Sequence, residues 1–267
     1  MSEPFPALDP RAARRNFERA ARSYAGASRL EAEVGARMQE RLDYVKLAPR
    51  RILDAGCGPV RRAPHKRYPH AEMLALDFSV GMLVAGRKRF FEKRKFVCAD
   101  LARLPLAAGA VDLVWSNMAL HWVREPLAAL REFARVLAPE GLLTFSTLGP
   151  DTLKELRAAA GSARVHAFAD MHDLGDMLVA AGFSAPVMDM EMLTLTYAAG
   201  TSLVDDLRAS GQRNARADRA RGLASRRLRT LASPPRASFE VVYGHAWKGA
   251  PRSETGEKTV RVFKRVP

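Results

Sequence analysis

Apolar and amphipathic segments alternate through residues 51–147, and this alternation constrains the fold more than any other feature. The apolar runs have the length and composition of strands, and they lie at 51–55, 72–77, 95–98, 111–116 and 141–147. Helices are predicted at about 79–90, 126–137 and 151–160. Strands that alternate with amphipathic helices form βαβ units, in which neighbouring strands run parallel. The sequence therefore predicts a doubly wound, mostly parallel α/β sheet.

The segments on either side of this region add helices before it and two more strands after it. Residues 10–24 and 27–47 carry apolar side chains at helical spacing, so we expect an N-terminal helical lid over residues 1–48. Downstream, the pattern predicts a helix at 171–181, strands at 187–197 and 238–247, and an Arg-rich helical stretch at 202–231. The main domain is expected to span 49–248, with a substrate-side elaboration at 149–237 and a tail at 249–267.

The first predicted strand runs into a glycine turn, RILDAGCG, that is typical of a cofactor site. Gly56 and Gly58 have no Cβ, which allows the backbone to approach a bound cofactor closely. The second strand ends in Asp77, whose carboxylate can accept hydrogen bonds from two ribose hydroxyls. Sheets that bind NAD and sheets that bind S-adenosylmethionine both use this arrangement.

The residues after the next strands distinguish the two cofactors. An NAD fingerprint needs a third glycine, but Gly58 is followed by Pro59, Val60 and Arg61. Asp100 follows the third strand, where it can accept from an adenine amino group, and the fourth strand ends in Ser116 and Asn117. These polar residues meet at the carboxyl edge of a parallel sheet, where such sheets bind ligands. These residues, in this order along the chain, favour S-adenosylmethionine over NAD as the cofactor.

The order DAGCGP, ALDFS, ADLARLP, VDLVWSNMALHW and EFARVLAPEGLLTFST resembles the class I S-adenosylmethionine-dependent methyltransferases. More narrowly, the chain resembles the malonyl-acyl-carrier-protein O-methyltransferases of biotin synthesis. This narrower resemblance rests on NFERAARSY, SNMALHWV, FADMHDLGDMLVAAGF, DLRASGQRNA and FEVVYGHAW, and it covers roughly residues 14–248.

The resemblance implies a seven-stranded Rossmann-like fold and a carboxyl O-methyltransferase that uses S-adenosyl-L-methionine. Such enzymes methylate the free carboxylate of a malonyl thioester, which disguises it as a fatty-acid primer for pimeloyl synthesis. The implied partner is an acidic acyl carrier protein that bears the malonyl group, and malonyl-coenzyme A is left open as the alternative. A membrane partner is not expected, and nucleic acid is disfavoured.

The resemblance also implies roles for individual residues around the cofactor. Expected neighbours of the methionine part, the ribose and the adenine are Gly56, Gly58, Asp77, Phe78, Met82, Asp100, Leu101 and Asn117. Asp54 either lies near the cofactor's amino group or only caps the turn. Tyr24 is expected on the lid over the sulfonium, where its ring face favours positive charge. Arg208 either holds the malonyl carboxylate or lies on a solvated helix face.

Two residues near the glycine turn are unusual. Val60 stands where the family usually has a glycine, and a β-branched residue is disfavoured if the position needs a positive φ. Pro64 is tolerated only in the first turn of a helix. We therefore expect a short, irregular helix after the first strand and weakened cofactor affinity, which Val60→Gly would restore.

Composition leaves a few alternatives open. The formal net charge of +14 suits a polyanionic or acidic partner, or solubility alone, because the basic residues are scattered. Cys57 and Cys98 form no CxxC pair, so no metal site is expected. No secretory signal or membrane span is evident, and a cytoplasmic protein is expected.

Two alternative functions remain open at this point. One is methylation of another small molecule or lipid precursor, and the other is cofactor binding by a catalytically weakened protein.

Overall fold

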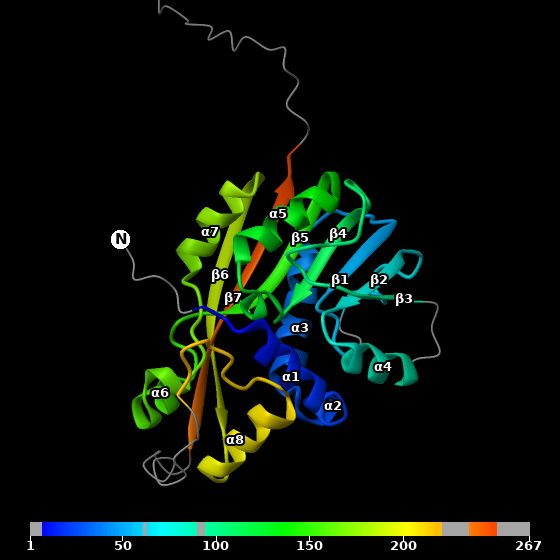
Figure 1. Cartoon of the computed structure of the whole chain (residues 1–267). Helices are drawn as coiled ribbons and strands as arrows, with labels where there is room; N and C mark the ends of the chain where they lie inside the picture. Colours follow the sequence, from blue (N-terminus) through cyan, green and yellow to red (C-terminus); the bar gives the residue numbers. More distant parts are fainter. Residues whose placement is uncertain (1–6, 61–62, 90–93, 221–234, 250–267) are drawn as a thin grey trace, which may run out of the picture.

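The computed structural model describes residues 7–60, 63–89, 94–220 and 235–249, and these form a sheet of seven strands (Figure 1). The strand order is β3-β2-β1-β4-β5-β7-β6. The strands are β1 (Arg51–Ala55), β2 (Glu72–Asp77), β3 (Lys95–Cys98), β4 (Val111–Asn117), β5 (Leu137–Leu148), β6 (Phe183–Thr196) and β7 (Arg236–Lys248). β1 to β5 pair in parallel, and β7 pairs antiparallel with both β5 and β6. The predicted doubly wound, mostly parallel fold is confirmed.

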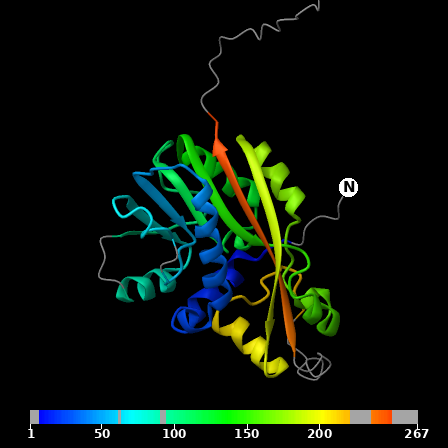
Figure 2. The ribbon, with the colours of Figure 1, turned by 180° about the vertical axis from the view of Figure 1, so that it is seen from behind.

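Helices cover both faces of the sheet. They are α1 (Pro10–Ala20), α2 (Tyr24–Ala27), α3 (Arg29–Arg41), α4 (Val80–Arg89), α5 (Pro126–Val136), α6 (Lys154–Ala160), α7 (Met171–Ala180) and α8 (Gly200–Ala209). Short 3-10 turns follow at η1 (Leu42–Tyr44), η2 (Leu120–Trp122) and η3 (Ser162–Arg164). Figure 1 shows α5 and α7 in front of the sheet, and Figure 2 shows α3 on the opposite face.

The alternation of side chains along each strand creates two cores, because successive residues point to opposite faces. Ile52 and Leu113 belong to the core beneath α3, which contributes Val34 and Met38. The neighbouring residues Leu53 and Val114 belong to the core beneath α5 and α7, which contribute side chains that include Phe133 and Leu178. The central strands β1, β4 and most of β5 are buried on both sides, which explains their nearly continuous apolar sequences.

The structure departs from expectation at two helices. Residues 63–71, after β1, form turns instead of the expected short helix, and Pro64 begins a single turn in which Tyr68 N–H donates to its carbonyl at 3.1 Å. The basic residues there offer no apolar face to bury. In the Arg-rich stretch, α8 ends at Ala209 and no helix continues through 210–220; residues 221–234 lie outside the described part of the chain.

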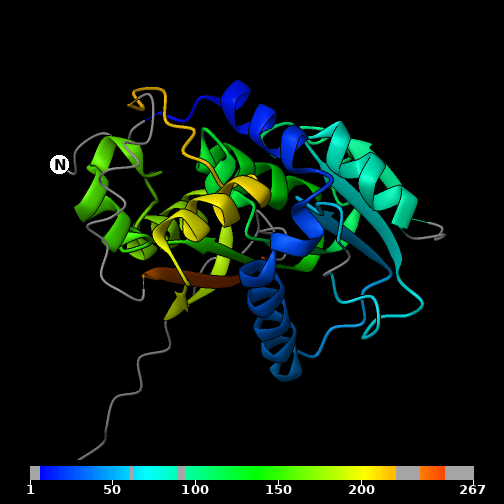
Figure 3. The same cartoon turned by 90° about the horizontal axis from the view of Figure 1, so that it is seen from below.

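The N-terminal segment and residues 209–217 lie side by side although they are far apart in sequence. Asp9 N–H donates to Ala215 O at 2.8 Å, and Ala217 N–H donates to Ala7 O at 2.8 Å. Ser23 Oγ, just before α2, donates to Ala209 O at 2.8 Å. Figure 3 shows α1, α2 and α8 together at one end of the sheet, and Figure 1 places this end at the carboxyl ends of the parallel strands.

Gly211 is a contact point between these two segments. Its φ is +77°, and a Cβ at this position would lie 2.9 Å from Phe17 Cδ1 and 3.2 Å from Ala20 Cβ of α1. Both the backbone conformation and the packing therefore require glycine.

We predict that Gly211→Ala lowers the free energy of unfolding by about 1–3 kcal/mol, through backbone strain and displacement of α1. Chemical denaturation would measure the change. The control is Gly26→Ala, where a Cβ meets nothing within 4 Å and alanine is tolerated in the helix. Equal stability of the parent protein and Gly211→Ala would contradict the assigned packing.

Candidate active site

A cavity of about 440 Å³ opens at the carboxyl ends of the parallel strands. Every predicted site residue except Asp54 and Arg208 lines it, namely Tyr24, Gly56, Gly58, Asp77, Phe78, Met82, Asp100, Leu101 and Asn117. These residues come from α2, from the turn after β1, from the ends of β2, β3 and β4, and from α4. We call this space the first cavity.

The glycine turn after β1 forms the floor of the first cavity. Gly56 and Gly58 have φ values of +79° and +55°, which glycine adopts without strain. A Cβ on Gly56 would lie 2.3 Å from Ala119 Cβ, so no side chain fits there. Gly58 N–H donates to Asp77 Oδ2 at 2.9 Å, which fastens the turn to the end of β2.

Asp77 is the buried carboxylate of this site, with 5% of its surface exposed. Its Oδ1 accepts from Ser79 N–H at 2.9 Å, and its Oδ2 accepts from Gly58. Burial raises the pKa of Asp77 to about 6, and the two backbone hydrogen bonds oppose that rise. Each carboxylate oxygen has a further lone pair, so both can accept from ribose hydroxyls.

Aromatic rings close one side of the first cavity. The ring centroids of Phe17 and Phe78 are 5.6 Å apart, and those of Phe17 and Trp122 are 5.1 Å apart, both in edge-to-face geometry. Met82 is fully buried beside them. The combination provides an apolar slot for a planar base. Phe17 was not predicted as a site residue, because its position over the cavity depends on how α1 docks.

The remaining predicted residues occupy distinct positions. Asn117 ties the sheet to α3, since its Nδ2 donates to Glu31 O and its Oδ1 accepts from Ser146 Oγ, both at 2.9 Å. Asp100 Oδ1 accepts from Ala102 N–H at 2.9 Å. The Tyr24 ring lies 3.7 Å from the position of a Cβ on Gly58. Asp54, in β1, is 3% exposed and does not line the cavity.

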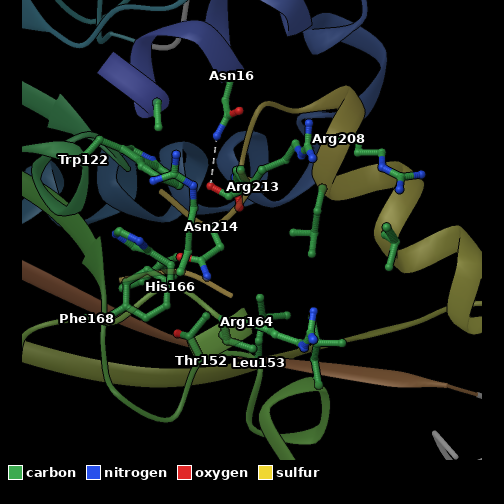
Figure 4. A pocket seen from close by; sticks show the side chains of 18 of the residues that line it. Asn16, Trp122, Thr152, Leu153, Arg164, His166, Phe168, Arg208, Arg213 and Asn214 are labelled. Atoms are coloured by element: carbon green, nitrogen blue, oxygen red, sulfur yellow. Dashed lines mark hydrogen bonds between the residues drawn. The ribbon is translucent and has the colours of Figure 1, made fainter. Parts of the chain in front are cut away.

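A second cavity, also about 440 Å³, lies beside the first and holds Arg208 (Figure 4). Trp122 lines both cavities and forms part of the wall between them. Arg208 Nη1 makes an ion pair with Asp205 Oδ1 at 3.0 Å, and the Arg208 side chain is 54% exposed. Within the described ranges of the chain, no cluster of three or more His, Cys, Asp or Glu side chains is placed to hold a metal ion.

Comparisons with known proteins identify the family. A methyltransferase domain model matches residues 53–145. Malonyl-[acyl-carrier protein] O-methyltransferases from Methylovorus sp. (strain MP688) and Gallionella capsiferriformans (strain ES-2) are 48% and 47% identical to the chain. The first alignment covers 90% of each chain, and the second covers 92% of this chain and 93% of the relative. The chain belongs to the malonyl-[acyl-carrier protein] O-methyltransferase family.

Solved structures agree on the fold. The YcgJ protein from Bacillus subtilis matches with a TM-score of 0.59 at 18% identity, over 82% of this chain and 98% of that one. The 1,6-didemethyltoxoflavin-N1-methyltransferase from Burkholderia thailandensis, solved with S-adenosylhomocysteine, matches with a TM-score of 0.51 at 17% identity, over 93% of each chain.

Family membership confirms the predicted enzyme class, a methyltransferase, and the predicted cofactor, S-adenosylmethionine. The first cavity fits that cofactor. It offers a buried carboxylate for the ribose at Asp77, an apolar slot beside Phe78 and Met82, and a floor at Gly56 where a Cβ would clash.

The strain expected at Val60 is absent. Among the described residues, the non-glycine residues with positive φ are Met118, Glu140, Leu153 and Ala185, and Val60 is not one of them. The positive φ angles of the turn fall on Gly56 and Gly58 instead. Val60 packs against the apolar cluster of α1 and α4. The premise for weakened cofactor affinity is therefore wrong.

We predict that Val60→Gly binds S-adenosylhomocysteine no more tightly than the parent and loses about 1–2 kcal/mol of stability, because it removes packing and adds backbone freedom. Calorimetric titration and chemical denaturation would measure the two effects. A tighter complex would restore the hypothesis of a strained turn.

We also predict that S-adenosylhomocysteine affinity falls about fourfold between pH 7.5 and pH 5.5, because protonation of a carboxyl group with a pKa of about 6 removes the acceptor for the ribose hydroxyls. The carboxylate is present above this pKa and is lost as the pH falls through it. Asp77→Asn should bind weakly at both values, without this pH dependence. A parent enzyme with constant affinity would contradict the assigned role of Asp77.

Proposed function

We propose that this enzyme transfers the methyl group of S-adenosylmethionine to the free carboxylate of a malonyl thioester on acyl carrier protein, at the start of pimeloyl and biotin synthesis. The observation that carries the proposal is the pair of cavities that meet at Trp122. The first has the cofactor-binding residues, and the second is lined by arginines and suits an anionic acceptor. The names of the relatives supply the identity of that acceptor.

This reaction needs no general base. A malonyl carboxylate is already ionised at neutral pH, and the bound cofactor supplies an electrophilic methyl group on a positively charged sulfur. The carboxylate oxygen forms the new O–CH₃ bond while the S–CH₃ bond breaks, and the bonding electrons stay on sulfur. Because no proton moves, the protein's contribution is alignment and exclusion of water.

Tyr24 and Arg208 have complementary roles in the proposal. Ser23 Oγ donates to Ala209 O, so the end of α8 that carries Arg208 is fastened to the start of α2, where Tyr24 lies. The ion pair of Arg208 with Asp205 is exposed and therefore weak, so a substrate carboxylate can replace it. The Tyr24 ring covers the methyl donor and favours its positive charge.

The N-terminal helices act as a lid in this proposal. Pro10 and Phe17 of α1 and Tyr24 of α2 line the first cavity from the side opposite the sheet. The described residues of the 1–48 lid would then cover the cofactor, and the described residues of the 149–237 elaboration within the catalytic domain would shape the acceptor side. The helices α6 and α8 and the 210–220 segment belong to that acceptor side.

The test is transfer of a labelled methyl group from S-adenosylmethionine to malonyl-acyl carrier protein, with acetyl-acyl carrier protein as the control. We expect label only on the malonyl form, and mild base should release it, as a methyl ester requires. Absence of transfer by the folded protein would favour a different small-molecule or lipid-precursor acceptor, or cofactor binding without turnover.

We predict that Arg208→Gln raises the KM for malonyl-acyl carrier protein about tenfold, because it removes a charged hydrogen-bond donor to the carboxylate. The affinity for S-adenosylhomocysteine should not change. Asp205→Asn is the matched control, since it removes the internal competitor for Arg208 and should leave the KM equal or lower. Unchanged steady-state kinetics in Arg208→Gln would assign the carboxylate to another residue.

A further inference from the structure

We infer that the second cavity binds the phosphopantetheine arm of the acceptor, with the phosphodiester held by Arg15, Arg19 and Arg213 and with His166 accepting a hydrogen bond from the arm. This inference rests on the proposed function, because it concerns the route by which a thioester reaches the methyl donor. It assigns a ligand to residues that the chemistry of methyl transfer does not itself require.

Helix α1 separates the two cavities and presents a different face to each. Pro10 and Phe17 face the first cavity. Arg15 and Arg19, one helical turn apart, line the second cavity together with Asn16. The cofactor and the arm would therefore lie on opposite sides of one helix and come together at Trp122.

The charge of the second cavity is unbalanced. Its described lining contains six arginines, at positions 15, 19, 164, 208, 213 and 219, and no Asp or Glu. Arg208 pairs with Asp205, and Arg219 pairs with Asp9. Within the described part of the chain, Arg15, Arg19 and Arg213 form no ion pair with a carboxylate. If Arg208 holds the malonyl carboxylate, these three guanidinium groups are available for a second anion, such as a phosphodiester.

His166 provides a buried acceptor in the same cavity. It is 7% exposed, and its ring stacks on Trp122 with the centroids 4.8 Å apart. Nε2 lies 3.1 Å from the carbonyl oxygen of His121, so Nε2 carries the proton and Nδ1 is left as an acceptor. Nδ1 is buried and has no hydrogen-bond partner among the described residues. Burial lowers the pKa of His166 to about 4, so the ring is neutral at physiological pH.

The rest of the lining is apolar, and this restricts the class of ligand. Leu148, Leu153, Leu156, Val204 and Phe239 form much of the wall. An inorganic anion or a sugar phosphate would leave this surface uncovered. A pantetheine arm has a branched alkyl segment for the apolar wall, amide N–H and hydroxyl donors for His166 Nδ1, and a phosphodiester for the arginines.

The experiment compares two acceptors that differ only in the phosphate, malonyl-pantetheine and malonyl-4′-phosphopantetheine, with the full-length enzyme. The parent enzyme should have the lower KM for the phosphorylated acceptor. In the double variant Arg15→Gln/Arg19→Gln and in Arg213→Gln, the KM for malonyl-4′-phosphopantetheine should rise about tenfold. The kcat values and the KM for malonyl-pantetheine should stay within about twofold of those of the parent enzyme. Arg14→Gln is the matched control, because Arg14 is an exposed arginine of α1 that does not line the second cavity.

The outcomes separate this inference from the proposed function. Two results would overturn the inference alone. The first is transfer by the parent enzyme to both acceptors with equal KM values. The second is an equal effect of the arginine variants on the KM values for both acceptors. Absence of transfer by the parent enzyme to malonyl-acyl carrier protein, measured in parallel, would overturn the proposed function and the inference with it. Comparing malonyl-acyl carrier protein with malonyl-coenzyme A then distinguishes the two sources of the arm, since the lower KM marks the preferred source.

His166→Phe tests the second contact. The substitution keeps a ring against Trp122 but removes Nδ1, so the KM for malonyl-pantetheine should rise severalfold while kcat and the affinity for S-adenosylhomocysteine stay unchanged. Thermal unfolding would verify that the variant is folded. An unchanged KM in the folded variant would remove His166 from the site.

Discussion

A hydrogen bond between distant elements fastens α1 to α4. Glu18 Oε2 accepts from Gly81 N–H in the first turn of α4 at 2.9 Å. The carboxylate thus meets the positive end of a helix. A Cβ on Gly81 would lie 2.4 Å from Glu18 Oε2, so a side chain at this position would displace the Glu18 carboxylate. On its other side α1 is held by the 209–217 segment, through contacts such as that of Phe17 with Gly211.

Both cavities follow from this placement. The apolar face of α1 closes the first cavity over Gly58 and Asp77, and its basic face lines the second. The carboxylates that line the first cavity are thereby kept apart from the arginines that line the second. A cofactor with a positively charged sulfur and an acceptor with a negative charge can then approach from opposite sides and meet at Trp122.

The sequence allowed the first cavity to be predicted almost completely, because its residues follow directly after strands whose apolar pattern is strong. Parallel strands bring Gly56, Asp77 and Asp100 to one edge whatever the surrounding helices do. The basic face of α1 was not predicted, since its role depends on where residues 209–220 dock. The prediction of strain at Val60 was wrong, because the positions of glycines in the sequence do not by themselves show which residues of a turn adopt a positive φ.

The most direct test is a crystal structure of the enzyme with S-adenosylhomocysteine and a malonyl-phosphopantetheine analogue that cannot be methylated. We expect the cofactor in the first cavity, the arm in the second, and the carboxylate beside Trp122 within van der Waals reach of the space for the transferred methyl group. An arm bound elsewhere, or a carboxylate separated from the cofactor by α1, would contradict it.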